Sequence, residues 1–372
     1  MKTIQKPIIY LANASSPHVL QWIEYLNDAD LKFHIYSIHK NKLFPSSSVT
    51  VKFNFCTKFG PIGSIFAYFL LGIWLRLFLS KSKIKYIHAH NTSGYGLSAY
   101  LSNSPYIITT YGSEIFQSNK KSNIYNRLIT NILQKSKTIT TTSKVMEALI
   151  IEKYKQPPSK IKTFSLGVSA AFNYSENNRN IIRKRLNIPQ NAIIWFANRR
   201  ITPLYNTLEL VHAFILFMES EKDIPAFLIL LRGECDNNYY RTITEITKNI
   251  SNIHIVKDFL PATEMAAFLS ASDIAISIPK SDQLSSSILE SLTCKCIPLL
   301  NDITAYQEIS SDFNCIKISN LSILSIEKAL NDSFIAAQNV QFRSFNELKI
   351  KDIEWNREKV LDKVILLYRQ WN

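Results

Sequence analysis

The chain lacks the cysteine pattern of a zinc-binding or disulfide-rich protein. Its five cysteines are scattered over 372 residues, and Cys294 and Cys296 form the only close pair. Because no second pair accompanies this one, zinc is not predicted, and reduced cysteines in a cytosolic protein are expected. The start of the sequence also lacks an apolar stretch long enough for the core of a signal peptide. A cytoplasmic location is therefore expected.

Acidic residues are scarce in the first half of the chain. Residues 1–185 hold 25 Lys and Arg against 7 Asp and Glu, whereas the remainder holds 18 against 22. This asymmetry suggests that the first half meets a polyanion, either nucleic acid or an anionic membrane surface. The basic residues are dispersed and accompany no recognisable nucleic-acid-binding motif. A membrane surface is therefore favoured, and no nucleic acid partner is predicted.

One long apolar run stands out, the 18 residues Ile62–Leu79, interrupted by Arg76. Its length is borderline for a membrane span. Since predicted strands lie on both sides of it, we expect a helix that packs on a sheet and leaves one apolar face exposed. A fully buried core helix and a true span are the alternatives. The groups expected to meet the lipid headgroups and anionic lipid are Phe66, Phe69, Leu70, Trp74 and Phe78, followed by Lys81, Lys83 and Lys85.

The chain has no internal repeat and no low-complexity tract. Apolar strand-like runs alternate with helical patterns through both halves, which predicts an α/β fold with two doubly wound sheets. The length agrees with two domains. We expect domains at 1–175 and 190–350, a polar linker across 170–190, and a final amphipathic helix within 351–372.

The stretch Ile274–Asp302 reads as strand, polar loop, helix and strand. Asp282 lies in the loop and Glu290 on the helix, at the sheet edge where open α/β sheets bind ligands. Such a helix start leaves backbone N–H groups free to meet an anion. Two carboxylates beside free N–H groups suit a nucleotide sugar; the alternative is a solvated helix start with two incidental acids. Three good N-cap residues open the helix, namely Ser285, Ser286 and Ser287.

Asp282-x7-Glu290 resembles the E-x7-E motif of family 4 glycosyltransferases, which have the GT-B fold. The first acid is shorter here, and two glycines of the family pattern are missing. The resemblance implies two Rossmann-like domains facing a central cleft. The first would face acceptor and membrane, the second would bind the nucleotide sugar, and the last helix would cross back to the first domain. The positions that fit the family pattern are Pro279, Ser286, Leu289, Glu290, Leu292 and Pro298.

The start of the second domain also resembles this family. Asn198–Asn206 matches "G-R-L-x-x-x-K-G", whose arginine and lysine hold the donor diphosphate. Arg200 matches the arginine, whereas Tyr205 replaces the lysine and offers only a neutral hydrogen bond. Arg199 is the candidate to compensate. The donor-binding residues that the resemblance implies are Arg199, Tyr205, Arg232, Gly233, Ser285, Ser286 and Ser287.

The first domain carries candidate acceptor-binding residues at three predicted strand ends. His18 follows the first strand, and His90 ends a strand that resembles "D-x-V-H-x-H". Tyr111-Gly112-Ser113-Glu114 resembles the family's Y-G-S-D loop, with Tyr111 where many members have a histidine base. Structural roles are the alternatives for His18, His90 and Glu114, the last as a helix cap. The acceptor-binding set is His18, His90, Tyr111, Gly112 and Glu114.

The resemblance implies a retaining glycosyltransferase without metal or other cofactor. It would move a sugar from a nucleoside-diphosphate sugar to a hydroxyl of a lipid-linked glycan in surface polysaccharide biosynthesis, at the inner face of the cell membrane. Glu290 would bind the ribose, Asp282 the transferred sugar, and Arg200 would stabilise the leaving diphosphate.

Two alternatives belong to other classes. The missing lysine and glycines favour a catalytically silent sugar- or nucleotide-binding scaffold of a polysaccharide assembly complex. An epimerase or phosphorylase on the same fold is less favoured, because those reactions need no membrane surface.

Overall fold

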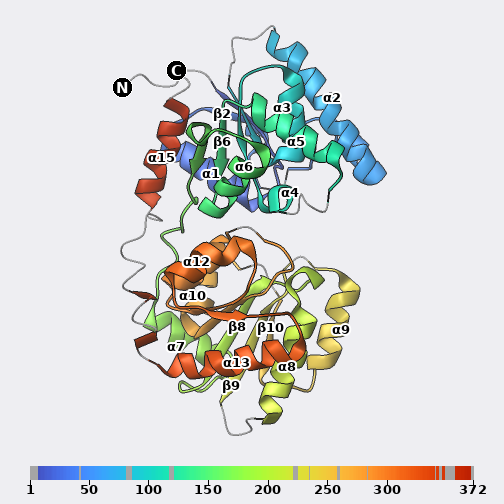
Figure 1. Ribbon diagram of the computed structural model, residues 1–372. Coiled ribbons are helices and arrows are strands. Elements are labelled where there is room, and N and C mark those ends of the chain that lie inside the picture. The colour runs from blue at the N-terminus through green and yellow to red at the C-terminus, as the bar shows by residue number, and fades with distance from the viewer. Residues whose placement is uncertain are drawn as a thin grey trace. The chain divides into compact units, whose positions relative to one another are not determined.

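The computed structural model consists of two compact units, residues 1–166 with 357–372 and residues 167–356 (Figure 1). Both contain a parallel sheet with helices between the strands, so the predicted α/β class is confirmed. Lys81, Lys83 and Lys85 lie outside the described residues. The structure describes 7–41, 43–80, 86–116, 121–220, 225–233, 235–257, 260–282, 284–339, 341–342, 346–347 and 357–369.

The first unit is built on a seven-stranded sheet with the order β3-β2-β1-β4-β5-β6-β7. Every neighbouring pair is parallel. The order reverses between β1 and β4, so the switch point where α/β sheets bind ligands lies at the carboxyl ends of these two strands. The strands are β1 (Ile8–Leu11), β2 (Phe33–Ser37), β3 (Val49–Val51), β4 (Ile87–His90), β5 (Tyr106–Thr109), β6 (Thr138–Thr141) and β7 (Ile161–Thr163).

Helices of the first unit connect these strands, and α15 joins them from the far end of the sequence. It lies beside α1 (Figure 1) and adds Val360, Val364, Leu367 and Tyr368 to the core around Trp22. The helices are α1 (Pro17–Asp28), α2 (Gly60–Ser80), α3 (Gly96–Ser102), α4 (Gly112–Phe116), α5 (Asn123–Lys135), α6 (Lys144–Tyr154) and α15 (Arg357–Arg369).

Helix α2 packs one face on the core and leaves the other exposed. Ala67, Leu71 and Leu75 are buried against the sheet, and α2 lies beside α3 (Figure 1). With the preceding turn it is the one described segment long and apolar enough to cross a membrane, by length and composition only. The predicted half-buried helix is therefore confirmed. Its exposed apolar face is formed by Ile62, Ile65, Phe66, Phe69, Ile73 and Leu77.

Three side chains predicted on that face lie elsewhere. Leu70, Trp74 and Phe78 are partly buried and pack against the core. Trp74 stacks on Phe78 with ring centroids 4.9 Å apart and also contacts Tyr36. That part of the prediction is wrong, because these three residues lie on the side of α2 that packs against the core, where Trp74 and Phe78 contact Tyr36.

The second unit contains a six-stranded sheet with the order β10-β9-β8-β11-β12-β13, again with parallel pairs. Its order reverses between β8 and β11, at the stretch that resembles the family motif. The strands are β8 (Ile193–Arg200), β9 (Ala226–Leu231), β10 (Ile253–Val256), β11 (Ile274–Ser277), β12 (Ile297–Asn301) and β13 (Ile316–Ile318). The helices are α7 (Glu176–Arg185), α8 (Thr207–Ser220), α9 (Asn237–Thr247), α10 (Ala262–Ala271), α11 (Ser286–Thr293), α12 (Gln307–Asp312) and α13 (Ile323–Gln338).

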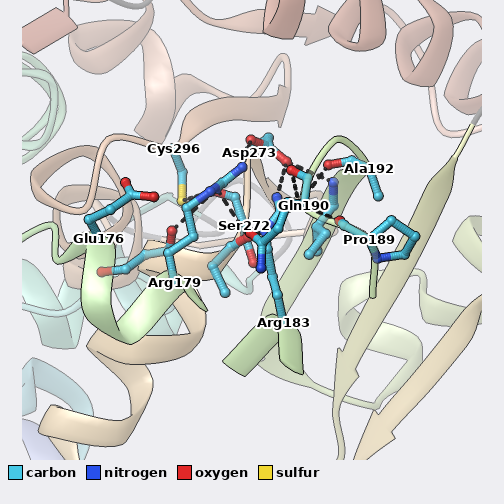
Figure 2. Close-up of polar contacts among 12 residues, drawn as sticks. Glu176, Arg179, Arg183, Pro189, Gln190, Ala192, Ser272, Asp273 and Cys296 are labelled. Carbon is cyan, nitrogen blue, oxygen red and sulfur yellow. Dashed lines mark hydrogen bonds and ion pairs between the residues drawn. The ribbon is translucent and has the colours of Figure 1, made fainter. Parts of the chain in front are cut away.

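The predicted linker at 170–190 is wrong, because these residues belong to the second unit, where Glu176–Arg185 forms α7. Figure 2 shows how Arg183 reaches from α7 to Asp273, with a contact of 2.9 Å. Its Nη1 also donates to the carbonyl oxygens of Pro189, Gln190 and Ala192. Arg183 therefore joins α7 to the sheet.

Candidate active site

The carboxyl ends of β8 and β11 meet at the switch point of the second unit. Strand β8 ends in Arg199 and Arg200. Strand β11 ends at Ser277 and continues into the loop that carries Asp282. The parallel pairing of β8 with β11 therefore brings an arginine pair to an acidic loop at the ligand-binding edge.

Arg199 is the centre of this edge. Its Nη2 lies 3.1 Å from Oδ2 of Asp282, and its Nη1 donates to Oγ of Ser287 at 2.8 Å. The guanidinium also donates to Ser285 and to the Tyr205 hydroxyl, and it lies 4.5 Å from the centre of the Tyr205 ring. The cation thus occupies the space over Tyr205, the residue that replaces the family's lysine.

Asp282 has a second partner that the sequence analysis missed. The Tyr306 hydroxyl donates to Oδ2 of Asp282 at 2.9 Å and lies 2.8 Å from Oγ of Ser277. Tyr306 belongs to the turn Thr304–Tyr306 after β12, the strand beside β11. The sequence does show that Tyr306 follows the strand after Asp282. Because the carboxyl ends of neighbouring parallel strands share one edge of the sheet, this position could have indicated that Tyr306 lies near Asp282.

Glu290 lies on α11, close enough to Arg199 for the two charges to interact. Burial raises the pKa of Glu290 to about 7, and the charge of Arg199 and a hydrogen bond from Ser286 oppose that shift. Burial also acts to lower the pKa of Arg199, but Asp282, Tyr205 and Tyr306 outweigh it and the pKa is raised. The guanidinium is therefore permanently charged, while Glu290 titrates near neutral pH.

The structure brings Arg199, rather than Arg200, to the two acids. Arg200 is exposed and pairs across the sheet with Leu231 after an irregularity in β8; it forms no ion pair within the described part of the chain. Gly233 has a φ of +56°, and a Cβ there would lie 2.7 Å from Cβ of Arg200. Glycine is thus required beside Arg200. Arg232 stacks over Tyr240 at 4.5 Å.

One of the three predicted N-cap candidates, Ser285, occupies the N-cap position of α11, and its side chain makes no capping hydrogen bond. Its hydroxyl accepts from Arg199 and bonds Ser287 at 2.7 Å, and Asn198 donates to the carbonyl oxygen of Ser287. The hydroxyls of Ser285 and Ser287 position the guanidinium instead of capping the helix.

In the first unit, His18, His90 and Tyr111 lie together. Nδ1 of His90 is 2.8 Å from the Tyr111 hydroxyl, and the His18 ring lies 5.7 Å from the Tyr111 ring. Burial and the nearby His18 lower the pKa of His90 to about 3, so its ring is neutral. Nε2 of His90 is buried without a hydrogen-bond partner among the described residues.

A buried chain of hydrogen bonds lies next to His90. His88 contacts the Tyr368 hydroxyl through Nδ1 at 2.5 Å and Oγ1 of Thr109 through Nε2 at 2.6 Å. The Tyr368 hydroxyl also bonds that of Tyr10, and the His88 and His90 rings lie 4.5 Å apart. The last helix therefore supports the strand end that carries His90.

Glu114 accepts hydrogen bonds from nearby backbone nitrogens. Its Oε1 accepts from the backbone nitrogen of Tyr111 at 2.8 Å and from that of Thr92 at 3.2 Å. Burial raises the pKa of Glu114 to about 6, against these hydrogen bonds. The contacts favour the capping alternative for Glu114, at the start of α4, where Gly112 is the first residue.

Comparison with known proteins supports the fold. Residues 7–143 match the family model described as "Glycosyl transferase 4-like". The chain resembles family 4 glycosyltransferases and has their GT-B fold. No curated protein matches the chain.

Three solved structures illustrate the GT-B likeness. A glycosyltransferase from Rickettsia africae is 16% identical, with 98% of each chain covered and a TM-score of 0.71. Anabaena HepE, solved in complex with UDP and glucose, is 12% identical over 98% of this chain and 100% of that one, with a TM-score of 0.75. A sucrose-phosphate synthase from Thermosynechococcus elongatus is 15% identical over 99% of each chain, with a TM-score of 0.73.

Proposed function

We propose that the protein is a retaining glycosyltransferase that uses a nucleoside-diphosphate sugar. The carrying observation is the ion pair of Arg199 with Asp282, 3.1 Å apart, at the switch point of the second unit, with Glu290 on the adjoining helix α11. A cation beside carboxylates that can bind hydroxyls matches a donor in which a diphosphate joins two sugars. The likeness to Anabaena HepE, which binds UDP and glucose, supports a donor of this class.

The proposed roles use the chemistry of two carboxylates and two guanidinium groups. Glu290 binds the ribose hydroxyls, Asp282 binds the transferred sugar, and Arg199 and Arg200 stabilise charge on the leaving diphosphate. The bond from the anomeric carbon to the phosphate oxygen breaks on the same face on which the acceptor oxygen attaches. The acceptor proton passes to the leaving phosphate oxygen, so the step needs no protein nucleophile and no metal.

The proposed acceptor is a lipid-linked glycan in surface polysaccharide biosynthesis. His18, His90 and Tyr111 offer ring faces and a buried ring nitrogen to a sugar at the switch point of the first unit. The exposed face of α2 suits the headgroup region of a membrane, since apolar faces of this size are otherwise rare in soluble proteins. Basic residues of the first unit would attract an anionic leaflet, which supports a peripheral position on the cytoplasmic side in this proposal.

The test is a turnover assay with a panel of nucleotide sugars on wild type, Arg199→Ala and Arg200→Ala. We expect the Arg199 variant to lose at least about a hundredfold in kcat, as when one oxyanion donor is removed. The Arg200 variant, whose side chain is exposed, should lose less. Full activity of both variants would contradict the phosphate roles.

A catalytically silent scaffold is the second candidate. The observation that favours it is Tyr205 in place of the family's lysine, with Arg199 held by protein groups. Calorimetry with the same panel separates the two functions, because a scaffold binds nucleotide without releasing it as product. Binding with no turnover for any donor and acceptor pair would establish the scaffold.

A further inference from the structure

Both terminal nitrogens of the Arg199 guanidinium already contact protein groups. Nη1 faces Ser285 and Ser287, and Nη2 faces Tyr205 and Asp282. The carboxylate of Asp282 contacts both the Arg199 guanidinium and the Tyr306 hydroxyl. The groups proposed to bind a phosphate and a sugar therefore bind each other.

We propose that Arg199 and Asp282 form a latch that an intact nucleotide sugar opens and that a free nucleoside diphosphate opens only at a cost. This inference rests on the proposed function and concerns how the same site selects its ligand. In the open state the diphosphate takes the guanidinium, and the released carboxylate takes hydroxyls of the transferred sugar. The pair is thus a specificity determinant for the whole donor.

A diphosphate is the ligand suited to replace Asp282 on Arg199. Arginine binds phosphate through a forked, charge-assisted contact, and a diphosphate offers more negative charge than one carboxylate. The hydroxyls of Ser285 and Ser287 can stay on Nη1 during the exchange, because only Nη2 contacts Asp282. The exchange therefore needs a change at one nitrogen rather than a movement of the whole side chain.

Asp282 decides the cost of opening. The carboxylate is 12% exposed in its ion pair, and a largely buried charge that loses its partner is strongly destabilised. Tyr306 satisfies one lone pair but supplies no charge. Hydroxyls of the transferred sugar can donate to the carboxylate that Arg199 releases, whereas a free nucleoside diphosphate carries no such sugar. After transfer the sugar is gone, so the latch closes again and favours release of the nucleotide product.

The experiment is calorimetry on the full chain with two ligand pairs, UDP-glucose against UDP and GDP-mannose against GDP. Wild type is compared with Asp282→Asn, which keeps the shape and removes the charge. Asp312→Asn removes a charge from an exposed position on α12 of the same unit and is the matched control. Unfolding curves establish that each variant is folded.

We expect wild type to bind the nucleotide sugar more tightly than the diphosphate of the same pair. Asp282→Asn should bind that diphosphate at least about tenfold more tightly than wild type, since no ion pair has to break. Its preference for the sugar-bearing ligand should fall by a similar factor. Asp312→Asn should behave as wild type.

The outcomes separate the latch from the proposed function. Absence of binding by wild type to all four ligands overturns the proposed donor class and the latch with it. Binding by wild type with an unchanged diphosphate affinity in Asp282→Asn overturns the latch alone. If that variant does not fold, Arg199→Gln is measured, and the latch is overturned unless its diphosphate affinity falls at least about tenfold.

Discussion

The guanidinium of Arg183 lies 2.9 Å from the carboxylate of Asp273, and both side chains are almost fully buried. Arg179 adds a second contact to the same carboxylate at 3.2 Å. Asp273 also accepts from the backbone nitrogen of Ile194, the second residue of β8. One carboxylate therefore joins α7 to the start of β8, the strand that carries Arg199.

Breaking this pair should destabilise the second unit. Arg183→Gln leaves a buried carboxylate with less compensation, which costs about 3–5 kcal/mol of unfolding free energy. Urea unfolding measures the change. The control is Arg185→Gln, which breaks the exposed Arg185–Glu264 pair on the same helix and should cost less than about 1 kcal/mol. Equal effects of the two variants would contradict the assigned role.

The hydroxyl of Tyr368 should stabilise the first unit. Tyr368→Phe leaves the buried partners Tyr10 and His88 each short of one contact, at a cost of about 1–3 kcal/mol. Tyr100→Phe, a partly exposed position on α3, should change little. Unfolding followed by near-ultraviolet circular dichroism checks both, and a neutral Tyr368→Phe would show that the network is not stabilising.

Glu290 should make stability depend on pH in a defined direction. Its pKa is about 7 in the folded state against an ordinary 4.5. Because the folded pKa is raised, the contribution of this group is full below pH 4.5 and is lost as pH rises through 7. Glu290→Gln does not undergo this loss of stability. Its free energy of unfolding relative to that of wild type should therefore increase by on the order of 2–3 kcal/mol across that pH window.

Unfolding at several pH values measures that difference, and parallel curves for the two proteins would refute it. Nucleotide binding should follow the opposite direction, because an ionised Glu290 accepts ribose hydroxyls better. Wild-type affinity should therefore rise between pH 6 and pH 8, around the pKa of about 7, and that rise should be absent in Glu290→Gln.

The exposed face of α2 should govern membrane binding. Replacing Ile65, Phe66 and Phe69 by serine removes apolar surface that would enter the headgroup region, and each exposed side chain of this size contributes about 1.5–3 kcal/mol when buried. Flotation with vesicles should show at least about tenfold weaker binding. Phosphatidylcholine vesicles with and without phosphatidylglycerol separate the apolar from the electrostatic part.

The matched control replaces Leu324 and Ile335 by serine, since both are exposed apolar residues on α13 of the second unit. This variant should float with the vesicles as wild type does. Equal loss in both variants would show that the apolar face of α2 has no special role.

Much of the fold follows from local sequence patterns. Ala226–Leu231 is an apolar run that forms β9, and Ser143 accepts from the backbone of Met146 at the start of α6, Lys144–Tyr154. Both patterns can be recognised in the local sequence alone. The region after β12 had no prediction, and it contains β13, α13 and Tyr306. Its short apolar runs carry little periodicity of their own and are fixed by pairing with β12.

The site was only partly accessible from the sequence. The spacing of Asp282 and Glu290 identified the loop and helix, but not which arginine faces them. Successive residues of a strand point to opposite faces, and the irregularity between Ala197 and Arg200 changes that alternation locally. Choosing between Arg199 and Arg200 therefore required the backbone. The Tyr368–His88 contact joins residues 280 positions apart, which no local pattern could predict.

The place of α15 in the first unit sets an order on folding during synthesis. The strands of that unit precede the second unit in the sequence, yet its core around Trp22 lacks Val364 and Tyr368 until α15 has been made. The second unit is complete in sequence before α15 and can fold first. Until α15 is made, a nascent chain therefore carries an unfinished first unit, with the apolar face of α2 exposed and one face of α1 uncovered.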